Sequence, residues 1–315
     1  MIGRNASILL NLKFHGMKRN YIFCILLIFV AAACHQNSKQ HNMKSQTSGD
    51  STAFRTGYAE VNGINMYYEL HGDKGEYLVL IHGGGSTIGT TFGKILPMLA
   101  DHYRVVAVEL QAHGHTGDRD APESFEQDAD DVAALLSHLH IAKASFFGFS
   151  NGGSTAMQIA VRHPAIVNKL VIASAIYKRS GLPPGFFEGM EHATLDNMPK
   201  ELQDAFLKIN PDRSKLLNMF TKDRDRMLHF KDWPDEMLQS VTAPALIING
   251  DRDVVTNAHA VAMSELIKNS RLMILPGSHG AYMGEIETPE TGSNIVKLTM
   301  EVIREFLDER GEDGR

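Results

Sequence analysis

The stretch from Ala144 to Gly153 constrains the fold of this chain more than any other, and its sequence is Ala-Ser-Phe-Phe-Gly-Phe-Ser-Asn-Gly-Gly. An apolar run enters a Gly-x-Ser-x-Gly turn, and a run of small residues leaves it. This pattern predicts a strand, a strained turn and a helix, with Ser150 at the apex. Gly148 and Gly152 lack Cβ atoms, so strand and helix can approach closely. A nucleophilic Ser150 requires a base and an orienting acid elsewhere; a glycine-rich turn with a capping serine is the alternative.

Short apolar runs alternate with helical patterns on both sides of this turn. The apolar runs occur at Tyr77–Ile81, Arg104–Leu110, Lys169–Ala173, Pro244–Asn249 and Arg271–Leu275. The helical patterns occur at Ile88–Ala100 (interrupted by Pro97), Ser124–His140, Asn151–His163, Ala258–Lys268 and 292–310. Before them, Asn62-Gly63 between two alternating segments is typical of a hairpin with a type I′ turn. The alternation predicts an α/β fold, with a mostly parallel sheet and helices on both faces.

The alternation breaks between residues 177 and 240, in a segment rich in methionine, phenylalanine and charge. Helical patterns occur there at Pro199–Ile209 and Pro211–Phe220. We predict a mainly helical cap, inserted into a core made of residues 57–176 and 241–312. Such caps commonly shape a substrate pocket. The apolar side chains of the cap can line that pocket or form the cap's own core, and the second interpretation is the default for any single residue.

The N-terminal segment has the pattern of an export signal. Met17-Lys18-Arg19-Asn20 is basic, Tyr21–Val30 is apolar, and Ala31-Ala32-Ala33-Cys34 ends in small residues and a cysteine. The apolar run is shorter than the roughly 20 residues of a transmembrane helix. We therefore predict a signal peptide over residues 1–33, with a possible true start at Met17, and a flexible polar tether over residues 34–56.

The position of Cys34 resembles the lipobox of bacterial lipoproteins, although Ala31 stands where leucine is more common. The resemblance implies cleavage before Cys34, lipidation of its thiol and amine, and an exported protein anchored in a membrane. An ordinary signal peptide or an uncleaved anchor is the alternative. The other cysteine, Cys24, lies within the signal, so the mature body can form no internal disulfide and its stability must come from packing.

Polar and glycine-rich segments follow the predicted strands, at the sheet edge where α/β active sites collect. His82-Gly83-Gly84-Gly85-Ser86 follows the first buried strand. Its glycines can turn backbone N–H groups toward a cavity, or they can form a flexible loop. Its pairing with the Ser150 turn favours an oxyanion hole, with one donor at the Gly84 N–H and the other at the Asn151 N–H.

Candidates for the acid and the base follow the last two strands. Gly250-Asp251-Arg252-Asp253 supplies two carboxylates, and Gly277-Ser278-His279-Gly280 places a histidine between small residues in a loop. Such a histidine is poorly explained as a core residue. His113 and His115, after an earlier strand, lack the cysteine or carboxylate spacing of a metal site, and we interpret them as structural loop histidines.

Together these segments resemble the α/β-hydrolase family over residues 58–310. Gly148-Phe149-Ser150-Asn151-Gly152, the later Gly250-Asp251-Arg252-Asp253 and the late Gly277-Ser278-His279 follow that family's order of serine, acid and histidine. His82-Gly83-Gly84-Gly85 matches its oxyanion loop, and His113-Gly114-His115-Thr116 resembles its loop after the next strand. Glu109 departs mildly from the pattern, because relatives often have aspartate there.

The resemblance implies a role for each residue of a catalytic triad. Ser150 would attack a carbonyl, His279 would transfer the proton, and Asp253 would orient the imidazole. Asp253 is preferred because the family motif places the acid fourth in Gly-x-x-Asp, and Asp251 is the alternative. Some relatives take the acid after the preceding strand, but Ala173-Ser174-Ala175-Ile176 offers no carboxylate there. A serine at the turn also argues against the dehalogenase and epoxide-hydrolase branches, which use aspartate.

The implied activity is hydrolysis of a carboxylic ester, lactone or thioester through an acyl-enzyme, without a cofactor or a metal. The partner would be a small ester-like molecule. A C–C bond hydrolase, an amidase or a lyase on the same fold is an alternative, and so is a non-enzymatic surface lipoprotein that uses the fold for binding. The net charge of −6 and the lack of a basic tract do not favour a nucleic-acid partner.

Overall fold

The computed structural model describes residues 54–288 and 293–309. The predicted signal peptide, Met17, Cys34 and most of the predicted tether lie outside these residues. The chain divides into two units, Met1–Ser48 and Gly49–Arg315, and the sheet with its helices belongs to the second. None of the helices in the described ranges has both the length and the apolar character needed to cross a membrane.

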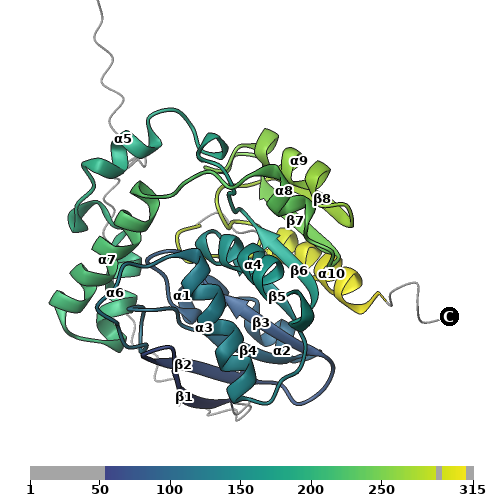
Figure 1. Ribbon diagram of the computed structural model, residues 1–315, viewed down its shortest axis with the longest axis horizontal. Helices are drawn as coiled ribbons and strands as arrows, with labels where there is room; N and C mark the ends of the chain where they lie inside the picture. Colours follow the sequence, from purple (N-terminus) through teal and green to yellow (C-terminus); the bar gives the residue numbers. More distant parts are fainter. Residues whose placement is uncertain (1–53, 289–292, 310–315) are drawn as a thin grey trace, which may run out of the picture. The chain divides into compact units, whose positions relative to one another are not determined.

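An eight-stranded sheet forms the core of the second unit (Figure 1). Its strands are β1 (Arg55–Val61), β2 (Ile64–His71), β3 (Tyr77–Ile81), β4 (Arg104–Val108), β5 (Ala144–Phe149), β6 (Val167–Ala173), β7 (Ala245–Gly250) and β8 (Ser270–Leu275). They lie in the order β1-β2-β4-β3-β5-β6-β7-β8. The strands from β3 to β8 pair in parallel, whereas β1 pairs with β2, and β2 with β4, in antiparallel fashion. The predicted α/β fold with a mostly parallel sheet is confirmed.

The hairpin that begins the sheet is confirmed in detail. Asn62 and Gly63 both have positive φ angles, 43° and 87°. A type I′ turn requires that conformation at both central residues, and its twist matches that of the flanking strands. The register that follows sets Val61 opposite Ile64 and Ala59 opposite Met66, and all four side chains are buried.

Helices cover both faces of the sheet, because side chains alternate along each strand. Leu78 and Leu80 face one apolar cluster, which contains α1 (Ile88–Phe92), α2 (Leu96–Ala100) and α10 (Ser293–Asp308). Val79 and Ile81 face the other, which contains α3 (Phe125–His138), α4 (Asn151–Arg162) and α9 (Asn257–Leu266). The helical pattern predicted over Ile88–Ala100 is broken between Phe92 and Leu96, just before Pro97. Pro97 itself stands in the first turn of α2, where its missing N–H costs nothing.

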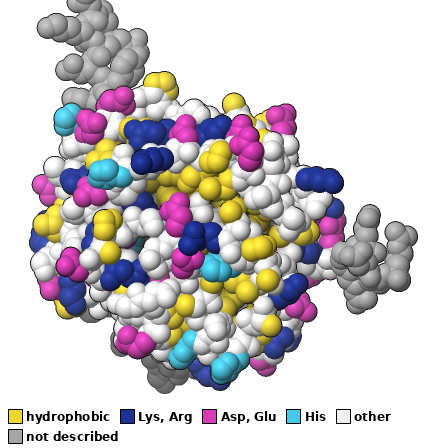
Figure 2. All heavy atoms as spheres, in the orientation of Figure 1, with side chains coloured by type: hydrophobic (Ala, Val, Ile, Leu, Met, Phe, Trp, Pro, Cys, Tyr) yellow, Lys and Arg dark blue, Asp and Glu magenta, His cyan; other side chains and the backbone are white. Residues whose placement is uncertain are grey.

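The segment predicted as a cap, and called the cap below, contains α5 (Phe186–Glu191), α6 (Lys200–Ile209), α7 (Arg213–Leu228) and α8 (Asp235–Gln239). It also contains the short 3₁₀ helices η2 (Arg179–Gly181) and η3 (Leu195–Asn197), whereas η1 (Pro164–Ile166) precedes β6. Six cap side chains form a small core with Ala112, namely Leu195, Met198, Leu202, Phe206, Leu216 and Met219. The interpretation of such residues as cap core therefore holds for this set. In the space-filling view, apolar side chains gather across the middle of the face, among charged ones (Figure 2).

Helix α7 is longer than the sequence predicts. The expected segment, Pro211–Phe220, ends eight residues before the observed end at Leu228. The extra residues are mostly charged, so they carry no apolar period that would predict a helix. Asp223 and Arg226 of this part are nevertheless buried, because the surface against which α7 packs is itself charged.

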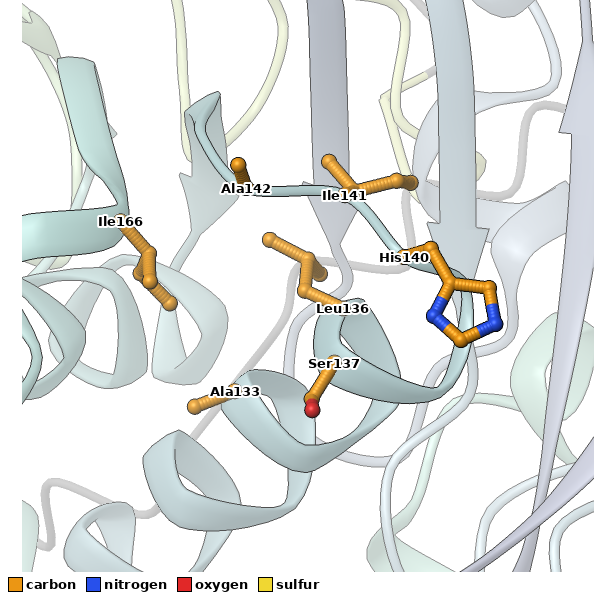
Figure 3. A pocket seen from close by; sticks show the side chains of 7 residues that line it. All are labelled: Ala133, Leu136, Ser137, His140, Ile141, Ala142 and Ile166. Atoms are coloured by element: carbon orange, nitrogen blue, oxygen red, sulfur yellow. The ribbon is translucent and has the colours of Figure 1, made fainter.

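A surface hollow of about 390 Å³ lies at the C-terminal end of α3 (Figure 3). Its lining residues are Ala133, Leu136, Ser137, His140, Ile141, Ala142 and Ile166. The chain passes from this hollow into the N-terminal end of β5, whereas Ser150 follows the C-terminal end of that strand. The hollow and the Ser150 turn therefore lie at opposite edges of the sheet.

Candidate active site

Ser150 stands between β5 and α4 with φ 54° and ψ −121°. Non-glycine residues rarely adopt this conformation, and the cost is of order 1–3 kcal/mol. Glycines allow it: a Cβ on Gly148 would lie 2.0 Å from the Gly152 carbonyl oxygen, and one on Gly152 would lie 2.1 Å from that of Ile81. The strained turn that the Gly-x-Ser-x-Gly pattern predicts is present, at the C-terminal edge of the sheet.

The glycine loop after β3 lies beside this turn. A Cβ on Gly83 would lie 3.3 Å from Ser150 Cβ, and one on Gly84 would lie 2.4 Å from the side-chain nitrogen of Asn151. The N–H of Gly83 donates to Thr91 Oγ1 (3.4 Å), and that of Gly85 donates to Asp223 (2.5 Å). Within the described ranges, the Gly84 N–H has no such acceptor. Asn151 begins α4, so its N–H has no partner within the helix.

His279 and Asp253 form a hydrogen-bonded pair. The imidazole Nδ1 lies 2.7 Å from Asp253 Oδ1, and the Asp253 side chain is fully buried whereas that of His279 is 28% exposed. The His279 ring packs on that of Phe149, with 4.7 Å between the ring centroids. Because Phe149 directly precedes Ser150, this contact places the imidazole next to the Ser150 turn.

The Asp253 carboxylate accepts several further hydrogen bonds. Ser174 Oγ donates to Oδ2 at 2.5 Å, and the N–H groups of Val255 and Gly250 donate at 3.0 and 3.3 Å. Burial alone would raise the pKa of Asp253, but His279 and these donors outweigh it and lower that pKa. Ser174 also lies 2.6 Å from the buried hydroxyl of Tyr282.

Ser174 and Tyr282 are neighbours of the Asp253 carboxylate that the sequence did not reveal. Ser174 follows β6, at the strand exit where the sequence offers no carboxylate, and it has a φ of 50°. In the sequence it is a single serine after an apolar run, which carries no pattern that would indicate its role. Tyr282 lies three residues after His279 and carries no motif of its own.

Asp251, the alternative acid, lies elsewhere. Its Oδ1 accepts a hydrogen bond from the Gly277 N–H at 2.8 Å, and its side chain is 48% exposed. It therefore braces the backbone of the loop that carries His279, whereas Asp253 contacts the imidazole itself.

The electrostatic surroundings of His279 favour its protonated form. Burial would lower its pKa, but the Asp253 carboxylate, with smaller contributions from Glu285 and Glu287, raises it above the ordinary value. Burial in turn raises the pKa of Glu285 to about 7. A histidine that binds a proton readily beside a serine turn is suited to general acid–base chemistry.

His113 has a partner that sequence reasoning missed. Its Nδ1 lies 2.8 Å from the Gln111 carbonyl oxygen, and its Nε2 lies 2.9 Å from Asp223 Oδ2 on cap helix α7. Both of these partners are acceptors, so both ring nitrogens carry protons. The Gly85 N–H also lies 3.3 Å from Nε2 but makes its shorter hydrogen bond to Asp223. Burial opposes the charge, but Asp223 outweighs it and raises the pKa of His113 to about 9. In the described ranges, no group of three or more His, Cys, Asp or Glu side chains is arranged to hold a metal.

His115 pairs with Glu109, the residue that departs from the family pattern. The Glu109 carboxylate accepts from the backbone N–H of His115 at 2.6 Å and lies 2.9 Å from its Nδ1. A Cβ on Gly114 would lie 2.3 Å from Glu109 Oε2. The longer acidic side chain thus closes the loop after β4, and Gly114 leaves room for it.

Comparisons with known proteins agree with this architecture. A family model described as alpha/beta hydrolase fold matches residues 76–206. The serine hydrolase BPHL from Homo sapiens is 29% identical over 253 residues, which cover 75% of this chain and 85% of that protein. The 2-hydroxy-6-oxo-6-(2'-aminophenyl)hexa-2,4-dienoic acid hydrolase from Metapseudomonas resinovorans is 26% identical over 263 residues, which cover 77% and 90%.

A solved structure also has the same fold. The serine hydrolase of carbazole degradation, CarC, superposes with a TM-score of 0.67 at 24% sequence identity, over 82% of this chain and 100% of that chain. The chain therefore has the alpha/beta hydrolase fold, which a family model matches over residues 76–206, and it is similar along most of its length to enzymes of that fold.

Proposed function

We propose that this enzyme is a cofactor-independent serine hydrolase that cleaves a carboxylic ester, lactone or thioester. Ser150 is the nucleophile, His279 the general acid and base, and Asp253 the orienting acid. The observation that carries the proposal is the strained turn at Ser150, with the ring of its neighbour Phe149 packed on a histidine that Asp253 holds through Nδ1.

Acylation of Ser150 would begin the reaction. Asp253 accepts the Nδ1 proton of His279 in a hydrogen bond, which leaves the Nε2 lone pair free to take the Ser150 proton. Ser150 Oγ then bonds to the substrate carbonyl carbon, and the electron pair of the C=O bond moves onto oxygen. The N–H groups of Gly84 and Asn151 would stabilise that oxyanion. The leaving group departs with the proton from His279.

Deacylation would use the same groups in reverse roles. His279 takes a proton from water, the hydroxide adds to the acyl carbon, and the bond to Ser150 Oγ breaks as the proton returns to the serine. The carboxylic acid product leaves. No step requires an electron donor or a metal, and each proton that His279 accepts is returned within the cycle.

Hydrolysis of activated esters tests this proposal. The experiment uses purified residues 35–315, the Ser150→Ala variant and a panel of p-nitrophenyl esters of increasing acyl length. We expect turnover by the parent that disappears in the variant, and the preferred length would measure the acyl pocket. Equal background rates in parent and variant would contradict the esterase proposal.

A C–C bond hydrolase is the second candidate, because the relative from Metapseudomonas resinovorans is named as the hydrolase of a dienoic acid. The same serine, histidine and aspartate would then act on a carbon–carbon bond next to a carbonyl. A vinylogous 1,5-diketone assayed beside the ester panel separates the two. Faster turnover of the diketone, with loss in Ser150→Ala, would favour this second function.

Retained ligand binding without turnover of any tested bond would instead favour the non-enzymatic lipoprotein.

For localisation, we propose export followed by lipidation at Cys34, because a basic, apolar and small-residue pattern precedes that cysteine. Radiolabelled palmitate incorporated by the full chain, and lost in Cys34→Ser, is the expected result. A protein released without label would contradict the lipid anchor.

A further inference from the structure

Cap helix α7 reaches the loop beside Ser150 through one carboxylate, that of Asp223. Its Oδ2 accepts a hydrogen bond from the Gly85 N–H at 2.5 Å. Its Oδ1 accepts a longer one, 3.4 Å, from the side-chain amide of Asn151. Gly85 directly follows Gly84, and Asn151 is the other residue assigned to the oxyanion hole. One cap side chain thus contacts both segments that would bind the substrate's carbonyl oxygen.

Asp223 is itself held by two cations. His113 Nε2 donates to Oδ2 at 2.9 Å, and Arg226 donates to Oδ1. With Gly85 and Asn151, all the groups that contact this carboxylate are hydrogen-bond donors. A carboxylate can accept about four hydrogen bonds. The four donors therefore occupy all the acceptor positions of Asp223 and fix the orientation of its side chain.

The surrounding cluster is balanced in charge. Arg226 also donates to Asp128 at 2.8 Å and lies 3.6 Å from Glu123. Burial raises the pKa of Glu123 to about 8 and that of Asp128 to about 6. At neutral pH the cations His113 and Arg226 therefore face the anions Asp223 and Asp128, and Glu123 keeps its proton. Moving Asp223 away would leave two buried cations opposite one anion, which is costly.

The first residue of the glycine loop is also fixed. His82 Nδ1 donates to the Gly83 carbonyl oxygen at 2.7 Å, and its Nε2 accepts from the Leu110 N–H at 3.1 Å. Burial, and then the neighbouring His113, lower the pKa of His82 to about 3. A neutral ring thus holds one end of the loop, while the charged cluster holds Gly85 at the other.

Cap side chains cover Gly85 on its open side. A Cβ at that position would lie 3.2 Å from Met198 Cε and 3.8 Å from a Leu202 methyl group. The end of the loop is therefore enclosed between α6 and the Asp223 carboxylate. Its conformation depends on the docked position of the cap as well as on the sheet below.

We propose that Asp223 is a positioning residue, through which the geometry of the oxyanion hole depends on the cap as well as on the core. It holds Gly85 and Asn151 so that the N–H groups of Gly84 and Asn151 converge on one oxygen only while α7 is docked. This inference rests on the function proposed for Ser150. Preorganised donors stabilise a developing oxyanion strongly, and a displacement of about 1 Å can cost roughly 10²-fold in rate.

The Asp223→Asn variant tests the proposal. Because every group around Asp223 is a donor, the NH₂ of an asparagine must face one of them, and the contacts to Gly85 and Asn151 cannot all remain. We expect kcat to fall about 10- to 100-fold, with KM within about threefold, because Asp223 contacts protein groups and not the substrate. Unchanged kcat in a folded Asp223→Asn variant would overturn the proposal.

The readout must exclude a simple loss of folded enzyme. A fluorophosphonate reacts with Ser150 by forming an O–P bond while the P–F bond breaks; His279 takes the serine proton and fluoride leaves. Labelling to completion counts the competent sites, so kcat is expressed per labelled serine. A structural defect would lower the number of sites, whereas misplaced donors lower kcat per site.

Asp118→Asn is the matched control. Asp118 accepts from Lys222 and Asn218 of the same helix, at 2.7 and 2.9 Å, but lies on the loop after β4 and holds none of the glycine-loop groups. We expect its kcat per labelled site to stay within about twofold of the parent. An equal loss in both variants would show that cap docking in general, and not Asp223, sets the rate.

Asn151→Ala keeps the test open if Asp223→Asn fails to fold. It removes the amide between Asp223 and Gly84 and leaves the ionic cluster intact. We expect a fall in kcat per site in the same direction, about 3- to 10-fold, and an unchanged value would contradict the coupling. An unreactive Ser150 in the parent chain would instead refute the proposed function, so the two failures can be told apart.

Discussion

The enzyme contains two aspartate–histidine pairs of similar length, and they differ in what surrounds the second ring nitrogen. Asp253 lies 2.7 Å from His279, and Asp223 lies 2.9 Å from His113. His279 is 28% exposed and, among the described residues, is hydrogen-bonded through Nδ1 alone. His113 is fully buried, and both of its nitrogens are occupied. The first pair has a free position for a reacting proton, whereas the second can only connect two parts of the protein.

The location of the aspartate explains the difference. Asp253 belongs to the core, where backbone N–H groups and Ser174 satisfy its remaining lone pairs. Asp223 belongs to the cap, and its remaining lone pairs hold a second cation and the glycine loop. One pair thus leaves an imidazole nitrogen without a hydrogen bond among the described residues, whereas the other joins α7 to the glycine loop.

The largest effect should follow from changing the core aspartate. In Asp253→Asn the side-chain NH₂ faces Nδ1, so His279 takes the tautomer that carries its proton on Nε2 and cannot accept one from Ser150. We expect kcat to fall about 10³- to 10⁴-fold. Ester turnover by the purified variant measures it.

Asp251→Asn is the control for that change, since the Asp251 side chain contacts the Gly277 N–H and Arg252 and, among the described residues, makes no hydrogen bond to His279. Its kcat should stay within about threefold of the parent. A loss in Asp251→Asn as large as that in Asp253→Asn would reverse the assignment of the acid.

The next effect is on stability and belongs to the cap pair. Arg226→Met removes one cation from the buried cluster and leaves Asp223 and Asp128 without their shared partner. We expect the free energy of unfolding to fall by about 3–5 kcal/mol. Urea unfolding monitored by the fluorescence of Trp233 measures this change.

His279→Gln supplies the comparison, because it removes the partly exposed member of the catalytic pair. Its free energy of unfolding should lie within about 1.5 kcal/mol of the parent value, as expected for one lost hydrogen bond. Similar losses in the two variants would mean that the pairs do not differ in the way proposed.

The pairing of Asp253 with His279 could be predicted from the sequence, and that of Asp223 with His113 could not, for one physical reason. Ser150, Asp253 and His279 follow apolar runs, and strands of that kind end at the same edge of a parallel sheet. Glycines mark the same places because the backbone turns tightly there. Position in the chain therefore indicates position in space, even though the residues are far apart in sequence.

Asp223 and Arg226 lie in a charged run of the sequence. Because the buried residues there are themselves charged, no apolar period marks the buried face of the helix. The sequence therefore predicted that α7 ends at Phe220, eight residues before its observed end at Leu228. Their partners Asp128 and His113 are equally polar. Hydrophobic periodicity in the sequence does not indicate which buried charged residues will contact one another. The contact of Ser174 with Asp253 could not be predicted for a related reason, because a single hydroxyl after a strand carries no pattern.

The cap cluster also predicts how stability depends on pH. The pKa of His113 is raised to about 9 and that of Glu123 to about 8. The folded state thus binds these protons more tightly than the unfolded state does. Their contributions are complete below the unfolded pKa values and are lost as pH rises through 8 and 9. We expect the free energy of unfolding to fall by on the order of 2 kcal/mol from pH 7 to pH 9.

Urea titrations at pH 7, 8 and 9 check this dependence, and Glu123→Gln is the informative variant. A neutral glutamine cannot ionise, so the fall between pH 7 and pH 8 should become smaller. The same slope in parent and variant would mean that Glu123 does not keep its proton at neutral pH.

The smallest effect concerns the support of the core aspartate. Ser174→Ala removes the hydroxyl that donates to Asp253 Oδ2 at 2.5 Å and also separates Tyr282 from the carboxylate. With one donor lost, the carboxylate holds more charge toward His279, and the pKa of His279 should rise. We expect kcat to fall less than about 10-fold, in line with one hydrogen bond, and the acid limb of the pH–rate profile to move to higher pH.

Tyr282→Phe isolates the outer member of this chain, because Ser174 then keeps its bond to Asp253. The same limb should move in the same direction by a smaller amount. A shift toward lower pH in either variant would mean that the hydroxyls act on the position of Asp253 rather than on its charge. The core pair would then resemble the cap pair, in which the neighbours of an aspartate matter chiefly because they hold it in place.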